Sequence, residues 1–140
     1  MKKLFILFAV LLFWACPSDD TYTRNPYIQQ INFSYDINMN LPTYSNLQFA
    51  SNYVIVDHIG INGVIVFNTG SGYVAYERSC ANHSLQSCSV LNLSGLEATC
   101  QCVDATRYSI FTGQIIAGTG DYGLVAYHVQ QSGDVLRVSN

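Results

Sequence analysis

Apolar and polar residues alternate strictly from residue 31 to residue 40. The apolar positions of this stretch are Ile31, Phe33, Tyr35, Ile37 and Met39, and every residue between them is polar. A period of two over ten residues is typical of a β-strand with one buried face. The pattern therefore predicts a half-buried strand over residues 31–40.

Short runs of β-branched and aromatic residues predict the other strands. They lie at residues 53–56, 64–67, 73–77, 124–129 and 135–138, and residues 110–116 predict a hairpin. Turn residues at 68–72, 112–113 and 131–134 indicate hairpins. Only residues 44–50 are compatible with a helical turn. Strands at this regular spacing predict an all-β sandwich or barrel, in a single domain over residues 28–140.

The first residues form a targeting segment. A basic head is followed by the apolar run 4–14, which is too short to span a bilayer and is typical of a signal peptide. Ala15-Cys16 before a polar stretch resembles the lipobox of bacterial lipoproteins. The resemblance implies a signal peptide over 1–15, lipidation of Cys16, a tether over 16–27 and a place in the outer membrane. Residues 18–20 resemble the acidic tag of surface-exposed lipoproteins; the alternative is an ordinary cleaved signal with an incidental cysteine.

Composition and charge exclude one class of partner. The chain of 140 residues is 49% apolar and 11% charged, with a formal net charge of −3. Removal of residues 1–15 leaves four arginines, no lysine and nine acidic residues, a net charge of −5. Nucleic-acid binding requires a basic surface that neutralises phosphates, so we expect no nucleic-acid partner.

Four cysteines fall within 23 residues, and they carry the most specific resemblance in the chain. Cys80-Ala81-Asn82-His83 followed by Cys100-Gln101-Cys102 resembles the two cluster-binding loops of Rieske [2Fe-2S] proteins. Residues 64–77 resemble the hairpin before the first loop, and residues 108–114 resemble the stretch after the second. Residues 54–140 are thus similar to a Rieske domain, with a loop subdomain near 79–113. The whole chain resembles the degenerate Rieske-like lipoproteins of Gram-negative bacteria.

The ligand positions depart from the Rieske pattern. A Rieske cluster takes two thiolates on one iron and two imidazoles on the other. Cys80 and Cys100 match the thiolate positions, but Asn82 and Val103 occupy the two histidine positions. His83 is adjacent to the first of these. His58 and His128 lie on predicted strands. We therefore expect the iron–sulfur cluster to be lost, and no other cofactor in its place.

The resemblance also implies what the cysteines do without a cluster. Cys88 and Cys102 match the positions of a disulfide that joins the two loops in many Rieske proteins, and Cys80 and Cys100 become neighbours once the iron is absent. We expect the disulfides Cys80–Cys100 and Cys88–Cys102, because thiols outside the cytoplasm oxidise. Two alternatives stay open. One is a [2Fe-2S] centre for electron transfer on Cys80, His83 and Cys100; the other is zinc on Cys80, His83, Cys100 and Cys102.

No arrangement of residues predicts catalysis, so we expect a protein that is not an enzyme. Ser79, Ser84, Ser87 and Ser89 lie near His83, but an oriented base and an oxyanion site have no signature here. The ten tyrosines suit either strands or a binding surface. The expected role is binding or structural, with an unidentified protein or carbohydrate partner.

Overall fold

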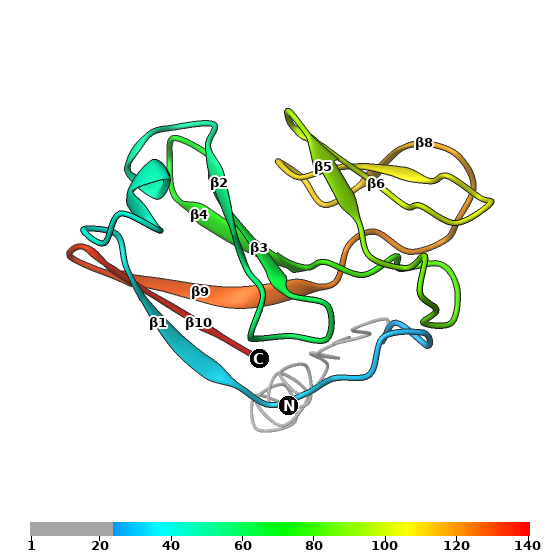
Figure 1. The fold of residues 1–140 in the computed structure, drawn as a ribbon, viewed down its shortest axis with the longest axis horizontal. Helices are drawn as coiled ribbons and strands as arrows, with labels where there is room; N and C mark the ends of the chain where they lie inside the picture. The colour runs from blue at the N-terminus through cyan, green and yellow to red at the C-terminus, as the bar shows by residue number, and fades with distance from the viewer. Residues whose placement is uncertain (1–23) are drawn as a thin grey trace, which may run out of the picture.

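The computed structural model describes residues 24–140, which form two antiparallel sheets. The larger sheet has the strand order β1-β10-β9-β4-β3-β2, and the smaller one has the order β5-β6-β7-β8 (Figure 1). The larger sheet comprises β1 (Ser34–Asn38), β2 (Tyr53–Val56), β3 (Val64–Asn68), β4 (Tyr73–Glu77), β9 (Ala126–Ser132) and β10 (Val135–Ser139). The smaller sheet comprises β5 (Asn92–Ser94), β6 (Glu97–Thr99), β7 (Arg107–Ser109) and β8 (Ile115–Ala117). The predicted all-β class is confirmed.

The only helical element in the described part of the chain is the short 3₁₀ helix η2 (Ser45–Gln48), inside the stretch predicted as a helical turn. Among residues 24–140, no helix has the length and apolar character needed to cross a membrane. The predicted signal peptide, the lipidation of Cys16 and most of the predicted tether lie outside the described residues.

Strand β3 lies between the two apolar cores of the fold, so both of its faces are buried. Val64 and Val66 pack into one apolar core, whereas Ile65 and Phe67 pack into a second. The first core is enclosed by the larger sheet, which curls so that Ile37 of β1 belongs to the same cluster as the β3 valines. The second core lies between the larger sheet and the smaller one. This position explains why residues 64–67 form a continuous apolar run instead of an alternating one.

The first predicted strand begins three residues later than its pattern suggests. Alternation holds in β1, where Ile37 is buried and its neighbours Asp36 and Asn38 are exposed. Ile31, however, is exposed and precedes the strand. The reason is the partner strand: β1 pairs with β10 from Ser34↔Ser139, and the partner strand ends at this pair.

Residues 110–116, which the sequence predicts as a hairpin around residues 112–113, hold the turn of one. The hairpin is present, but its strands are β7 and β8, and residues 110–114 form the turn between them. Gly113 has φ +73° and packs against the ring of Tyr76, which leaves no space for a Cβ. An L-residue there would be strained as well as crowded, so the chain turns at this glycine. The small sheet consequently extends to Ala117, past the expected end of the loop subdomain near 113.

A buried carboxylate joins two parts of the larger sheet directly before the cysteine loops. Glu77, the last residue of β4, is fully buried and accepts four hydrogen bonds. Its Oε1 accepts from the Asn62 amide at 2.9 Å and the Ser79 hydroxyl at 2.7 Å. Its Oε2 accepts from the Ile61 amide at 2.8 Å and the Tyr127 hydroxyl at 2.7 Å. Glu77 therefore fixes the β2–β3 connection and β9 to the strand that leads into the first loop.

The start of the described chain is fixed to the loops. The Asn25 side-chain amide donates to the Ala81 carbonyl at 2.8 Å, and the Tyr27 ring packs edge-on against Tyr122. Ile28 is buried. The last residues of the expected tether are thus packed on the domain, beside the cysteine loops.

Candidate functional site

Two loops at the end of the small sheet bring the four cysteines together. The first runs over residues 80–91 after β4, and the second runs over 100–106 between β6 and β7. The structure contains the disulfides Cys80–Cys100 and Cys88–Cys102, with Cα–Cα separations of 5.5 and 5.1 Å. This pairing is the one that the Rieske resemblance implies. Cys80 and Cys100 are buried in the second core, whereas Cys88 and Cys102 are half-buried.

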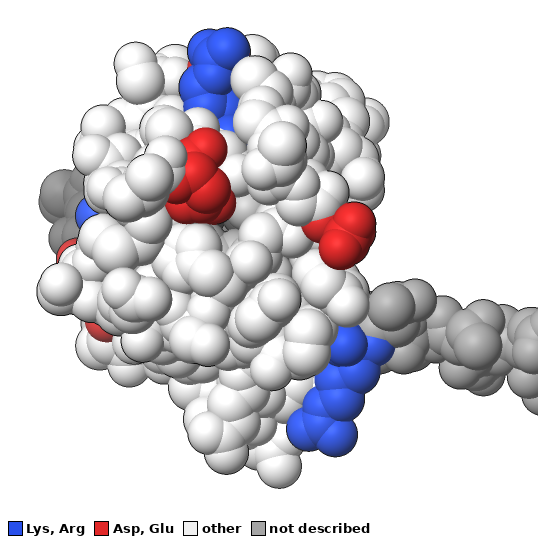
Figure 2. All heavy atoms as spheres, turned by 90° about the vertical axis from the view of Figure 1, so that its right-hand side faces the viewer, with Lys and Arg blue, Asp and Glu red and all other residues white. Residues whose placement is uncertain are grey.

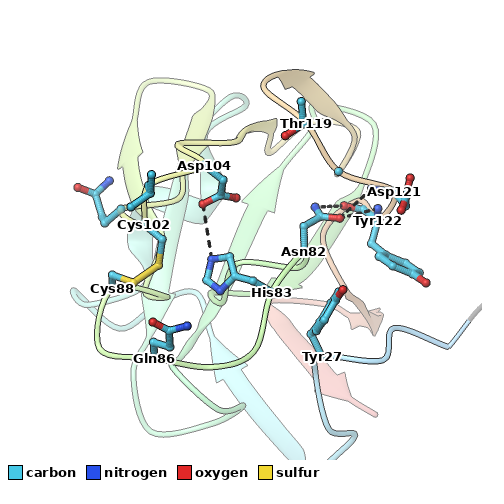
Figure 3. Close-up of a pocket in the computed structure, with 13 residues that line it drawn as sticks. Tyr27, Asn82, His83, Gln86, Cys88, Cys102, Asp104, Thr119, Asp121 and Tyr122 are labelled. Atoms are coloured by element: carbon cyan, nitrogen blue, oxygen red, sulfur yellow. Dashed lines mark hydrogen bonds and ion pairs between the residues drawn. A yellow bond between two sulfur atoms is a disulfide. The ribbon is translucent and has the colours of Figure 1, made fainter.

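The histidine of the first loop lies against the buried disulfide. His83 Nε2 is 3.1 Å from Cys100 Sγ, and His83 Nδ1 is 2.9 Å from the Ser84 carbonyl oxygen. Because a carbonyl only accepts, this contact places a ring proton on Nδ1. Nε2 also lies 3.7 Å from Asp104 Oδ1, an oxygen that is buried and has no hydrogen-bond partner (Figure 3). The imidazole therefore turns Nε2 toward sulfur and a carboxylate.

Four donor atoms of this region lie close enough to hold one metal ion. The Sγ atoms of Cys80, Cys100 and Cys102 and a ring nitrogen of His83 are all within 4.8 Å of one another. These are the four residues for which the sequence leaves zinc open. The fourth cysteine, Cys88, is not part of the group.

The same residues do not fit a Rieske [2Fe-2S] cluster, because a second imidazole is missing. Val103, at the second histidine position, is fully exposed at the tip of its loop. His58 lies in a turn after β2, not on the strand predicted for it, and packs against Tyr35. His128 lies on β9, as predicted, with its partner residue Ser139 on β10. His58 follows a strand of the larger sheet and His128 lies on another, so among residues 24–140 His83 is the one imidazole in the two cysteine loops.

Asn82, at the first histidine position, has a structural task that sequence reasoning missed. Its Oδ1 accepts from the amides of Asp121 and Tyr122, each at 2.9 Å. Its Nδ2 donates to the Tyr122 carbonyl and the Tyr108 hydroxyl, each at 2.8 Å. Gly120 lies so close to this amide that a Cβ would overlap it. Asn82 thus joins the first loop to the segment between β8 and β9.

Tyr108 supports the loops as a neutral residue. It is fully buried on β7, and burial raises the pKa of its hydroxyl, although the hydrogen bond from Asn82 acts in the opposite direction. A phenol with a raised pKa stays protonated near neutral pH. Tyr108 consequently serves as a hydrogen-bonding partner for Asn82 and not as an anionic ligand.

A cleft of about 570 Å³ opens between the two loops and the 119–122 segment. Figure 3 shows His83 and Asp104 near its middle, the Cys88–Cys102 disulfide on one side, and Tyr27 and Tyr122 on the other. Its walls are formed by Tyr27, Asn82, His83, Gln86, Cys88, Gln101, Cys102, Val103, Asp104, Thr119, Gly120, Asp121 and Tyr122. No lysine or arginine of residues 24–140 belongs to this set. Figure 2, which faces the right-hand side of Figure 1, shows few charged side chains, separated by uncharged surface.

Two of the four serines near His83 have hydroxyls in local hydrogen bonds. Ser79 donates to Glu77, and the Ser89 hydroxyl accepts from the Gln86 amide at 2.8 Å. Ser84 contacts the His83 ring through its carbonyl, not its hydroxyl. The hydroxyls of Ser79 and Ser89 thus help to hold the first loop.

Comparison with known proteins gives likeness to solved structures only. No family model matches the chain, and no curated protein matches it. It is similar to a chain of the complex of reduced oxygenase and oxidized ferredoxin in carbazole 1,9a-dioxygenase: 18% identity, a TM-score of 0.49, and coverage of 79% of this chain and 94% of that one. It is also similar to the ferredoxin of carbazole 1,9a-dioxygenase from Nocardioides aromaticivorans IC177: 21% identity, a TM-score of 0.43, and coverage of 64% and 86%.

Proposed function

We propose that this chain is a lipid-anchored protein of the cell envelope whose Rieske-like domain has exchanged its iron–sulfur cluster for two disulfides and binds a ligand in the cleft between its loops. The role is binding, not catalysis. The cleft is the observation that carries the proposal, because its walls are held by the disulfide-linked loops and by the Asn82 hydrogen bonds.

The loss of the cluster is supported by what its ligand positions do instead. The two thiolate positions, Cys80 and Cys100, are joined to each other. Asn82 is engaged in four hydrogen bonds, and Val103 faces solvent. A second imidazole within reach would be needed to complete the cluster. Each of the four ligand positions is thus either altered or engaged elsewhere.

The walls of the cleft suggest the class of ligand. Its volume is within the range of small-molecule sites. Two tyrosine rings offer apolar faces, the side chains of Gln86 and Gln101 offer amides, and Asp104 and Asp121 offer carboxylates. The absence of lysine and arginine from the described walls disfavours anionic ligands. We propose an uncharged, polyhydroxylated ligand such as a short oligosaccharide, whose C–H face packs on a tyrosine ring while its hydroxyls bond to amides and carboxylates.

The cluster-free state is tested on the full chain carrying Cys16→Ser, purified anaerobically in mild detergent. We expect a colourless protein without iron and with no free thiol among its four remaining cysteines. A brown protein with two irons per chain would instead support the second candidate, a [2Fe-2S] electron-transfer protein that uses Cys80, His83 and Cys100. That outcome would refute the proposal.

Ligand binding is tested by applying the same protein to an array of neutral, amino and acidic oligosaccharides. We expect retention on neutral glycans. Tyr122→Ala should weaken binding by about tenfold, the usual effect of removing an aromatic residue at the centre of an interface. Phe49→Ala is the matched control, since Phe49 is an exposed aromatic residue outside the cleft and its loss should leave binding unchanged. Equal effects of the two substitutions, or retention only on acidic glycans, would contradict the proposed site.

A further inference from the structure

The cysteine cluster has a second arrangement available, in which its sulfurs are thiolates. Cys80, Cys100 and Cys102 belong to two different disulfides, yet their Sγ atoms and a His83 ring nitrogen lie within 4.8 Å of one another. Tetrahedral zinc with bonds of about 2.3 Å to sulfur and about 2.0 Å to nitrogen holds its donors less than about 4 Å apart. Small movements therefore separate the observed positions from a tetrahedral set.

The imidazole already has the orientation that a metal ligand requires. Its Nδ1–H donates to the Ser84 carbonyl, so the Nε2 position is directed at Cys100 Sγ, 3.1 Å away. Histidines that bind metals usually donate the other ring N–H to a carbonyl or carboxylate, which fixes the ring and its tautomer. The Ser84 carbonyl makes that contact.

A second, independent observation points to a cation at the same place. Asp104 Oδ1 is buried without a hydrogen-bond partner and lies 3.7 Å from His83 Nε2. A buried carboxylate oxygen without a donor is costly. A divalent ion held by the cluster would place positive charge beside this oxygen.

We propose that reduction of both disulfides converts this cluster into a Zn²⁺ site with the ligands Cys80, Cys100, Cys102 and His83. Two molecules of a dithiol supply four electrons and four protons, are oxidised to two cyclic disulfides, and leave four thiols on the protein. Zn²⁺ then displaces the protons of Cys80, Cys100 and Cys102, which are released to solvent, and binds Nε2 of neutral His83. Cys88 keeps its proton and remains a free thiol. The domain thus alternates between an oxidised state held by disulfides and a reduced state held by a metal.

The experiment uses the full chain with Cys16→Ser, reduced under anaerobic conditions with a phosphine and titrated with Co²⁺, whose visible spectrum reports tetrahedral thiolate ligation. We expect one Co²⁺ per reduced chain, complete displacement by Zn²⁺, and no binding to the oxidised chain. A reduced chain that binds no Co²⁺, or an oxidised chain that binds it equally, would overturn the proposal.

Matched variants assign the ligands. Reduced Cys88→Ala retains all four donors and should bind Co²⁺ as the reduced parent does. Reduced His83→Ala and Cys102→Ala each lack one donor, so their affinity for Co²⁺ should fall by about tenfold or more. Their Co²⁺ spectra should also differ from that of the reduced parent. Far-UV circular dichroism is recorded before and after the metal is added. A reduced chain that loses its strands and regains them on metal addition also supports the site. Loss of binding in Cys88→Ala together with normal binding in His83→Ala would refute it.

Discussion

Replacing Asn82 with alanine removes the four hydrogen bonds that the Asn82 side chain makes to its neighbours. The backbone amides of Asp121 and Tyr122 lose their acceptor, and the Tyr122 carbonyl and the Tyr108 hydroxyl lose their donor. The alanine Cβ occupies the same place as that of asparagine, so the backbone itself need not move. The substitution therefore isolates the contribution of one side-chain amide to holding the walls of the cleft together.

The expected loss of stability follows from the burial of these partners. The bond to the Asp121 amide is exposed, so water can replace it at little cost. The other three are partly buried, and Tyr108 is fully buried. At about 1 kcal/mol for each such bond, the free energy of unfolding should fall by about 3 kcal/mol. With a urea m-value of about 2 kcal/mol per M, the midpoint should fall by about 1.5 M.

Urea unfolding monitored by far-UV circular dichroism measures the global loss, and amide hydrogen exchange measures the local one. Exchange at Asp121 and Tyr122 should accelerate before the β-strands lose protection. The control is Asn46→Ala in η2, because Asn46 is exposed and its side chain has no hydrogen bond to any described residue; its effect should stay within about 0.5 kcal/mol. If Asn82→Ala were as mild as this control, with exchange at 121–122 unchanged, the assigned role of Asn82 would be wrong.

Three further predictions concern the interior and the anchor. Glu77→Gln should lower the free energy of unfolding by about 2–4 kcal/mol, measured by urea unfolding. Only one end of the glutamine amide accepts hydrogen bonds, so one backbone N–H of the β2–β3 connection loses its acceptor. An effect below about 0.5 kcal/mol would contradict this. Burial, and after it the hydrogen bond to Glu77, raises the pKa of Tyr127 far above its ordinary value. The folded state therefore keeps a proton that the unfolded state releases, so stability should be level below about pH 10 and fall above it, and Tyr127→Phe should flatten that decline in unfolding curves taken across this range. Cys16→Ala should move the protein from the membrane to the soluble fraction after cell lysis; unchanged partition would argue against lipid anchoring through this residue.

The sequence predicted the larger sheet well because its strands are apolar runs or alternating stretches long enough to recognise. Residues 53–56 and 73–77 match β2 and β4 in their bounds, since turn residues flank both runs. The strands of the small sheet were missed at residues 92–94 and 97–99. Each has only three residues, which is too few for a period of two to stand out from chance. Their order is set by pairing with β7, which local sequence does not report.

The sequence pointed to the cysteines of the candidate site but not to the residues that support them. The positions of Cys80 and Cys100 carried a family resemblance, and the structure places their sulfurs together. The roles of Asn82 and Asp104 depend on segments that are distant in sequence: Asn82 bonds to residues 39 and 40 positions away. The sequence shows that Asn82 stands where Rieske proteins have a histidine. It does not show the hydrogen-bond partners of Asn82, because no local pattern encodes a contact between the first loop and the 119–122 segment.

The pairing of β1 with β10 also determines how the domain would respond to force. Ser34 lies beside Ser139 at one edge of the larger sheet, so β1 begins where β10 ends. Tension applied between them would peel β1 from β10 one residue pair at a time, without ever loading all of their hydrogen bonds together. The peeling would stop at the loops, where Cys80–Cys100 and Cys88–Cys102 are covalent. The larger sheet would therefore unfold first, while the segment from Cys80 to Cys102 would stay covalently linked.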